Sequence, residues 1–68
     1  MKYTVIIEKT GNGYSASVPD LPGCIAAADT KTEVGALIRD AIVLHLGPLH
    51  EHGDPIPEPH TTAALVEV

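Results

Sequence analysis

Two prolines that stand three residues apart, Pro19 and Pro22, constrain this chain more than any other feature of its sequence. Proline fixes the backbone angle φ and has no N–H group to donate, so neither a helix nor a central strand continues through such a pair. Gly23 follows directly and accepts backbone conformations that other residues resist. The segment PDLPG, residues 19–23, is therefore predicted to be a rigid corner that bends the chain sharply.

The residues before this corner predict a β-hairpin. Residues 2–8 alternate in polarity and are rich in β-branched side chains, which indicates a strand with one buried face. Residues 9–13 (KTGNG) supply two glycines and an asparagine, the residues that accept positive φ in tight turns. The alternation then resumes in a second strand. The predicted inner face consists of Tyr3, Val5, Ile7, Tyr14, Ala16 and Val18.

A third strand and a helix are predicted after the corner. Residues 24–28 (CIAAA) indicate a short strand of small side chains. Thr30 and Glu33 have the spacing of a capping box, in which the threonine hydroxyl accepts from the Glu33 amide and the glutamate reaches back to the Thr30 amide. The helix is therefore expected to begin near Lys31. Its apolar stripe is formed by Val34, Leu37, Ile38, Ala41 and Leu44 or His45.

A glycine-proline pair at residues 47–48 marks the expected end of this helix. Proline removes an interior hydrogen bond and disfavours helical geometry at the preceding residue, so the helix is expected to stop or kink near Leu46, with residues 49–52 available for one extra turn. Residues 53–59 (GDPIPEP) are too rich in proline for regular structure and predict an extended connector. Residues 63–68 are predicted to close the chain as a final strand.

The resulting order of elements, β-β-β-α-β, predicts an α+β fold with a single sheet covered on one face by one helix. A strand, a crossover helix and another strand are normally connected with right-handed geometry, which places the final strand parallel to the third strand in one sheet. The opposite sheet face is expected to be small and half-apolar, and to be a place where another chain packs. Its residues are Thr4, Ile6, Ser15, Ser17, Ile25 and Ala27.

The length of the chain limits its stability. Its 68 residues have room for one domain, and a domain of this size buries only about 60% of the surface that its unfolded chain exposes. Cys24 is the one cysteine, so no disulfide forms within the chain, and association with another chain, as a homo-oligomeric dimer or tetramer, is the expected stabiliser. The single cysteine, with no N-terminal leader and no long apolar run, indicates a cytoplasmic protein without membrane contact.

The charge balance bears on the class of partner. Four lysines and arginines stand against nine aspartates and glutamates, a net charge of −5, and no basic residue adjoins another. Capture of a phosphate backbone requires several positive charges on one face. The sequence therefore predicts no direct binding of nucleic acid and favours a basic protein as partner, although many small domains are acidic only for solubility.

Three segments of the sequence, GYSASVPDLPGCIAAADT, TKTEVGALIRDAIVLHL and HGDPIPEP, together resemble the HicB family of antitoxins, whose core domain carries a GYxAxxPDLPGC-type segment, a helix and a PxP connector. The resemblance extends from Lys2 to about Pro59. It implies a partial ribonuclease-H-like fold with strand order 3-2-1-4 and one helix. It also implies an antitoxin that occludes a HicA-type toxin, a small basic ribonuclease that uses a histidine to cleave messenger RNA.

The resemblance leaves operator binding open. Many members of the family carry a C-terminal helix-turn-helix or ribbon-helix-helix segment that represses their own operon. This sequence ends at Val68, so residues 1–68 are interpreted as a single HicB-like core domain without a C-terminal DNA-binding domain. The alternative interpretation is a stand-alone oligomeric domain of the same fold, with a structural or regulatory role and no toxin partner.

The sequence contains few candidate catalytic residues. A ribonuclease H site needs clustered carboxylates, one of them from the middle of the first strand, where this chain has Val5-Ile6-Ile7. Cys24 would need a lowered pKa to act as a nucleophile, and its small apolar neighbours favour a buried structural thiol. The spacing of the histidines favours exposed side chains over a metal site: His45, His50, His52 and His60. We therefore expect no enzyme activity, no metal and no cofactor.

The corner itself has two interpretations. In one, the prolines and the glycine set the angle between strands and seat Leu21 in the core. In the other, Asp20 and Leu21 project from a preorganised loop into a partner, because a rigid loop loses little entropy on binding. Acidic side chains elsewhere would complement a basic toxin and steer its encounter. The full set of partner-binding candidates is Glu8, Asp20, Leu21, Asp29 and Glu33.

Overall fold

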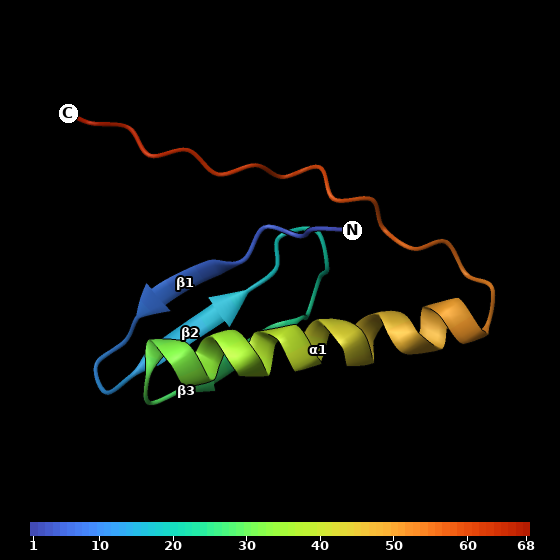
Figure 1. The fold of residues 1–68 in the computed structure, drawn as a ribbon, viewed down its shortest axis with the longest axis horizontal. Helices are drawn as coiled ribbons and strands as arrows, with labels where there is room; N and C mark the ends of the chain where they lie inside the picture. The colour runs from blue at the N-terminus through green and yellow to red at the C-terminus, as the bar shows by residue number, and fades with distance from the viewer.

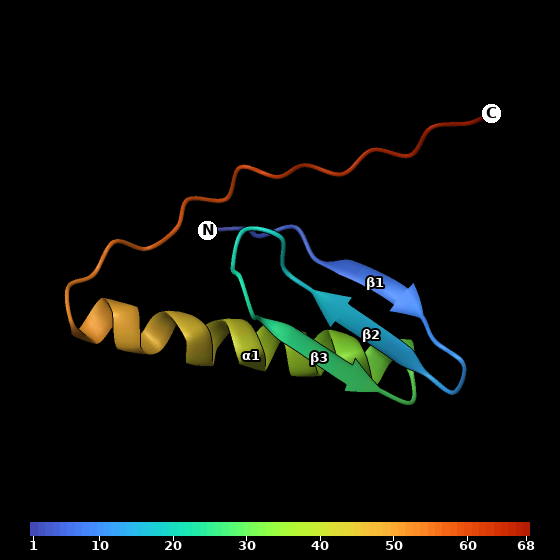
Figure 2. The same cartoon turned by 180° about the vertical axis from the view of Figure 1, so that it is seen from behind.

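Three antiparallel strands and one long helix make up the fold in the computed structural model, which describes residues 1–68 (Figure 1). The strands are β1 (Ile6–Lys9), β2 (Tyr14–Ser17) and β3 (Ile25–Ala28), and the helix is α1 (Lys31–Glu51). The strands form one sheet in the order β1-β2-β3, and α1 packs across one face of it on β2 and β3 (Figure 2). The predicted α+β class is confirmed.

The hairpin between β1 and β2 forms where glycine and asparagine are concentrated. The two strands pair from Ile6, opposite Ser17, towards the turn, and the amide of Thr10 donates a 2.8 Å hydrogen bond to the carbonyl of Gly13. A Cβ at Gly13 would collide with the carbonyl oxygen of Ala28. Glycine is therefore required where the turn approaches the end of β3.

The first strand is shorter than the predicted residues 2–8, because β1 begins only at Ile6. Tyr3 and Val5 lie before it and still pack against the core, as their alternation predicted. Ile7 was predicted on the same inner face but is 37% exposed. The reason is its place on the edge strand, since α1 covers β2 and β3.

The corner closes on itself through three backbone hydrogen bonds. The Leu21 amide donates to the Val18 carbonyl at 3.0 Å, the Cys24 amide to the Leu21 carbonyl at 3.1 Å, and the Val18 amide to the Cys24 carbonyl at 3.2 Å. Gly23 has a φ of 82°, a conformation that favours glycine. The corner thereby places Leu21 in a small core, which consists of Ala16, Val18, Leu21, Cys24, Val34 and Ile38.

The start of α1 agrees with the sequence. Thr30 is the N-cap, and its hydroxyl oxygen accepts a 3.1 Å hydrogen bond from the Glu33 amide. The second bond differs from the predicted capping box, because the Thr30 hydroxyl donates to the Glu33 carboxylate at 2.9 Å. Val34 and Ile38 then point into the core, so one face of the first half of α1 is buried.

The sequence predicted that α1 stops or kinks near Leu46, with residues 49–52 available for one extra turn. The predicted stop is wrong, because the helix continues through Pro48 to Glu51, and residues 49–51 form a further turn. The steric conflict between a proline and the residue before it involves that residue's Cβ, and Gly47 has none. Two penalties remain at the carbonyl of Leu44: the missing hydrogen bond from position 48 and the crowding by the proline ring. Leu44 is 75% exposed, so solvent reaches this part of the helix.

As a result, α1 extends well beyond the sheet (Figure 1). Its 21 residues span about 31 Å, whereas each strand has four residues and spans about 13 Å. The C-terminal half of the helix therefore has no strand beneath it. The structure contains no helix that is both long and apolar enough to span a membrane.

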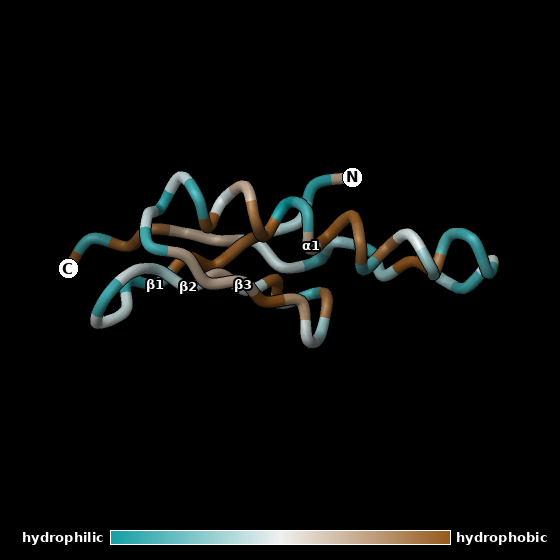
Figure 3. The backbone as a smooth tube through the Cα atoms, turned by 90° about the horizontal axis from the view of Figure 1, so that it is seen from below, coloured by the Kyte–Doolittle hydropathy of each residue, from teal (hydrophilic) through white to brown (hydrophobic).

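The final strand predicted at residues 63–68, parallel to the third strand in the same sheet, is absent. The three strands present follow the implied order 3-2-1 without the fourth. The connector, with prolines at 55, 57 and 59, forms no ladder with β1, and residues 63–68 beyond it pair with no strand. Side chains hold it instead: the Tyr3 hydroxyl donates to the Pro57 carbonyl and the Thr4 hydroxyl to the Thr61 carbonyl at 2.6 Å. Beyond Thr61 the segment is exposed and partly hydrophobic (Figure 3).

Candidate functional site

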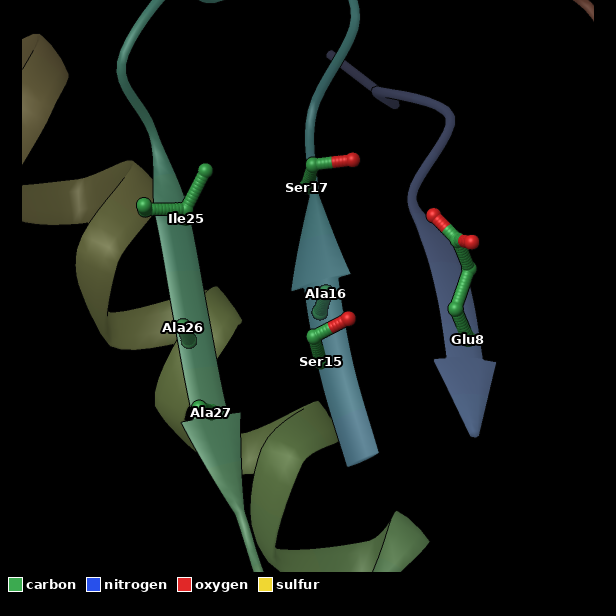
Figure 4. Close-up of a pocket in the computed structure, with 7 residues that line it drawn as sticks. All are labelled: Glu8, Ser15, Ala16, Ser17, Ile25, Ala26 and Ala27. Carbon is green, nitrogen blue, oxygen red and sulfur yellow. The ribbon is translucent and has the colours of Figure 1, made fainter. Parts of the chain in front are cut away.

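The sheet face that points away from α1 has no cover (Figure 2). Side chains alternate along a strand, so every second residue of each strand points to this side. Figure 4 shows the two serines and Ile25 projecting from it. Ile25 is 71% exposed and Ile6 is 44% exposed. We call this surface the outer face, and it consists of Ile6, Glu8, Ser15, Ser17, Ile25 and Ala27.

The outer face is an open, largely apolar surface with few polar groups. It forms a shallow hollow of about 530 Å³, but the residues that line it include no histidine or lysine that would serve as a base for the serines. Glu8 is its one carboxylate. Small-molecule sites have several polar groups that converge on the ligand, and this hollow does not. An exposed apolar surface of this kind is typical of protein contacts.

Asp20 lies inside the corner and does not project from it. Its side chain is 1% exposed. The carboxylate accepts a 2.6 Å bond from the Thr61 hydroxyl and 3.1 Å bonds from the amides of Thr61 and His60. Leu21 is 0% exposed and belongs to the core. Of the two interpretations of the corner, the structure agrees with the one that seats Leu21 in the core. It contradicts the projection of Asp20 and Leu21 into a partner, because Asp20 fastens the C-terminal segment and Leu21 fills the interior.

The same bonds lower the pKa of the Asp20 carboxyl. The hydroxyl of Thr61 contributes most, and burial opposes it by raising the pKa. The amides of Thr61 and His60 and the charge of the His60 ring, whose Nδ1 lies 3.1 Å from Oδ1 of Asp20, add to the lowering. Asp20 therefore stays ionised near neutral pH and acts as an acceptor that holds the chain in place.

The other three acidic candidates are exposed at the opposite end of the sheet from the corner: Glu8, Asp29 and Glu33. Glu8 is near the end of β1, Asp29 follows β3, and Glu33 lies in the first turn of α1. The fold thus places these three carboxylates at one end of the sheet, whereas Asp20 lies at the other end, in the corner. Lys9 and Lys31 lie beside them in the chain, so positive charge accompanies this group.

The cysteine and the histidines do not form a reactive centre. Cys24 is buried, and this burial raises the pKa of its thiol, so little of the nucleophilic thiolate is present. His60 lies at Asp20, whereas His45 and His50 are on α1 and His52 caps its end. The structure contains no group of three or more His, Cys, Asp or Glu side chains arranged to hold a metal ion.

A second hollow, which the sequence analysis missed, lies between the C-terminal half of α1 and the connector. It has a volume of about 400 Å³. It exists because α1 continues past Pro48 and because the chain then turns back, with Gly53 at a φ of 70° and the Asp54 amide donating to the Leu49 carbonyl at 2.8 Å. We call it the helix-end groove, and its lining is Val43, Leu46, Gly47, His50, Glu51 and Ile56.

One feature of the sequence could have predicted this groove. Residues 42–44 (IVL) place three consecutive apolar side chains on a helix, which is more than one stripe against a sheet uses. Val43 is 63% exposed and Leu44 is 75% exposed. The predicted stop near Leu46 concealed the signal, because a helix that ended there would have no groove beside its last turns.

Comparison with known proteins finds relatives along nearly the whole chain. The family described as "HicB_like antitoxin of bacterial toxin-antitoxin system" matches residues 3–68. A UPF0150 protein of Thermoplasma acidophilum is 45% identical over 58 residues, which cover 84% of each chain. Antitoxin HicB 2 of Photorhabdus laumondii is 35% identical over 69 positions, which cover 100% of this chain and 50% of that one.

A further relative is a 14.9 kDa protein from the rep-hol intergenic region of Haemophilus phage HP1, with 40% identity over 58 residues, or 85% of this chain and 44% of that one. The chain thus spans about half the length of the phage and Photorhabdus relatives.

Two solved structures share the fold. The crystal structure of antitoxin HicB3 matches with a TM-score of 0.72 and 32% identity, over 84% of this chain and 42% of that one. A chain of the HicA3 and HicB3 toxin-antitoxin complex matches with a TM-score of 0.70 and 30% identity, over 88% of this chain and 70% of that one.

Proposed function

Because the chain belongs to the HicB-like antitoxin family, we propose that it is the antitoxin of a type II pair and neutralises a HicA-type ribonuclease by binding it and covering its active site. The observation that carries this proposal is the structural match to a chain of a toxin-antitoxin complex, which extends over 88% of the present chain. The family match extends over the same sheet and helix. The proposed site of action is the cytoplasm.

The proposed role is binding without catalysis and without a cofactor. Asp20 is ionised and occupied by three hydrogen-bond donors, and the thiol of Cys24 is buried with a raised pKa. Neither group is poised to donate or accept a proton in a reaction. We propose that Leu21 and Asp20 support the toxin contact indirectly, by holding the shape of the corner.

The exposed acidic candidates fit a role in steering. Glu8, Asp29 and Glu33 are open to solvent at one end of the sheet. Carboxylates on a surface accelerate the encounter with a basic partner and repel phosphate backbones. We therefore propose that they face a basic toxin during association, and that this chain does not itself bind nucleic acid.

A second candidate function is favoured by the outer face. Two exposed isoleucines, Ile6 and Ile25, stand on an uncovered sheet beside small side chains. With only 7 of 68 residues buried, the chain gains stability by covering this face with another copy. A homo-oligomer, dimer or tetramer, with a structural or regulatory role is the alternative. A stable folded monomer upon dilution in light scattering would contradict the oligomer.

The experiment for the antitoxin function is a ribonuclease assay. A HicA-type toxin from the same host is mixed with increasing amounts of the purified chain, and cleavage of a messenger RNA is followed. We expect cleavage to cease at a stoichiometric ratio. An unrelated protein of similar negative charge serves as the control for non-specific attraction. Continued cleavage in the presence of excess chain would contradict the proposed function.

A further inference from the structure

The net negative charge of the protein is confined to its C-terminal part. All four lysines and arginines lie at or before Arg39, and four of the nine acidic residues lie there too, so this part is neutral. The remaining five acidic residues, which account for the net charge of −5, have no basic residue among them. They are Asp40, Glu51, Asp54, Glu58 and Glu67.

The helix-end groove lies in this charged part and combines an apolar lining with acidic neighbours. Val43 is 63% exposed on one side, and Ile56 of the connector is half-buried on the other. Glu51 lines the groove, while Asp54 and Glu58 are exposed on the connector on either side of Ile56 in sequence. Gly47 has no atom within 4 Å of the position of an added Cβ, so the groove is open at this point.

The apolar lining and the negative charge indicate what kind of segment the helix-end groove would bind. An apolar side chain gains free energy by leaving water next to Val43 and Ile56. Lysine or arginine beside it would pair with the carboxylates of this region, because the same part of the chain contains no lysine or arginine. A second copy of the groove carries the same negative charge, and a phosphate backbone is also anionic, so both are repelled.

We propose that the helix-end groove is a docking site for the toxin, and that it takes a lysine- or arginine-rich segment that inserts an apolar side chain between α1 and the connector. This inference rests on the proposed antitoxin function and specifies its surface. The acids at the sheet end differ, because Lys9 and Lys31 accompany Glu8, Asp29 and Glu33. The groove region therefore supplies the net attraction.

Two pairs of variants test the groove. Val43→Asp places a charge in its apolar lining, and Leu44→Asp is the matched control, because Leu44 is a neighbouring exposed residue of α1 that does not line the groove. Glu51→Lys reverses a charge in the groove, and Glu67→Lys is the matched control, because Glu67 is an exposed carboxylate that does not line the groove. Circular dichroism establishes that each variant is folded before binding is measured.

Binding is measured by titration with a HicA-type toxin from the same host, inactivated by replacement of its catalytic histidine. We expect Val43→Asp and Glu51→Lys to weaken binding by about tenfold or more, and the two controls to bind like the unmodified chain. Glu51→Lys should also reduce the dependence of affinity on salt, because one charge pair is lost.

Other results of these binding measurements would contradict the groove proposal, the antitoxin function or both. Toxin binding that is unchanged by Val43→Asp and Glu51→Lys would overturn the groove and leave the antitoxin function intact. Equal weakening by Glu51→Lys and Glu67→Lys would attribute binding to net charge alone and overturn the groove. Failure of the unmodified chain to bind the toxin would overturn both proposals. Loss of a homo-oligomer in Val43→Asp, with toxin binding retained, would assign the groove to a second copy.

Discussion

The hydroxyl of Thr61 donates a 2.6 Å hydrogen bond to the carboxylate of Asp20, which lies 41 positions earlier in the chain. The amides of His60 and Thr61 donate to the same carboxylate, so three donors converge on a side chain that is 1% exposed. Hydrogen bonds to an ionised acceptor are shorter and stronger than those between neutral groups. This cluster, the Asp20 latch, fastens the C-terminal segment to the corner between β2 and β3.

Removal of the Thr61 hydroxyl should release the C-terminal segment. Thr61→Val keeps the shape of the side chain but removes the hydroxyl that donates to Asp20 and contributes most to the lowering of its pKa. We expect a lower urea midpoint of unfolding and faster hydrogen exchange at the amides of residues 60 and 61. Thr62→Val is the matched control, since Thr62 is exposed and its side chain makes no hydrogen bond in the structure. Equal effects of the two substitutions would show that the latch does not hold the segment.

Acid should weaken the latch in a defined direction. In the folded protein the pKa of Asp20 lies below its ordinary value of 3.8, and in the unfolded chain it has that ordinary value. The unfolded state therefore binds the proton first as the pH falls. The contribution to stability is complete above about pH 5 and is lost as the pH falls through 3.8 and then through the lower folded-state pKa.

The variant Asp20→Asn tests this pH dependence. Near neutral pH it should be less stable than the unmodified protein, because the amide is uncharged and its NH₂ group cannot accept from the donors. Its free energy of unfolding should also fall less steeply as the pH is lowered from about 5 to about 2. The measurement is the urea midpoint at a series of pH values. Parallel curves for the two proteins would contradict the role assigned to the ionised carboxyl.

The parts of the fold that were predicted correctly depend on neighbouring residues. The turn before Tyr14, the corner that seats Leu21 and the cap at Thr30 each involve residues a few positions apart. Turn and cap residues act through their own backbone geometry, so a short window of sequence contains the whole cause. The alternation of side chains likewise gave the correct inner face for Ala16 and Val18.

The features of the fold that were predicted wrongly depend on contacts between residues far apart in the sequence, or on several opposing contributions to the free energy. One of the two interpretations of the corner had Asp20 project from it, but its hydrogen-bond partners lie some 40 positions away and bury it. Residues 63–68 have strand-forming side chains but no strand beside them. At Pro48 the helix continues, and Gly47 removes the steric conflict between the proline and the Cβ of the preceding residue. The helix-end groove follows from this last difference and was therefore missed as well.

Cys24 should react slowly with thiol reagents in the native protein. Its side chain is buried in the core, and burial raises its pKa, so both access and the thiolate fraction are reduced. We expect labelling by a thiol-specific reagent near pH 8 to be slow in buffer and fast in urea. Thr62→Cys supplies an exposed thiol in the same chain as the control. Rapid labelling of Cys24 without denaturant would show that the core opens readily.

Gly13 should tolerate no side chain. A Cβ there would collide with the Ala28 carbonyl, so Gly13→Ala must displace the hairpin turn or β3, at a cost of about 1–3 kcal/mol in the free energy of unfolding. Gly11→Ala in the same turn is the control, because nothing lies within 4 Å of its added Cβ. Denaturant unfolding of both variants provides the comparison. A stability of Gly13→Ala equal to that of Gly11→Ala would contradict the close approach.

Pro48 should lower the stability of α1. The substitution Pro48→Ala restores an amide that can donate to the carbonyl of Leu44 and removes the ring that crowds this carbonyl. We expect the free energy of unfolding to rise by about 1–3 kcal/mol, reduced somewhat by the greater freedom of the unfolded chain. Pro55→Ala in the connector, outside the helix, is the control and should gain nothing. Thermal unfolding of both variants is followed by circular dichroism at 222 nm, where α-helices give a negative band. A Pro48→Ala protein no more stable than the unmodified chain would mean that α1 does not run through position 48 in solution, and the helix-end groove would lose the turn that lines it.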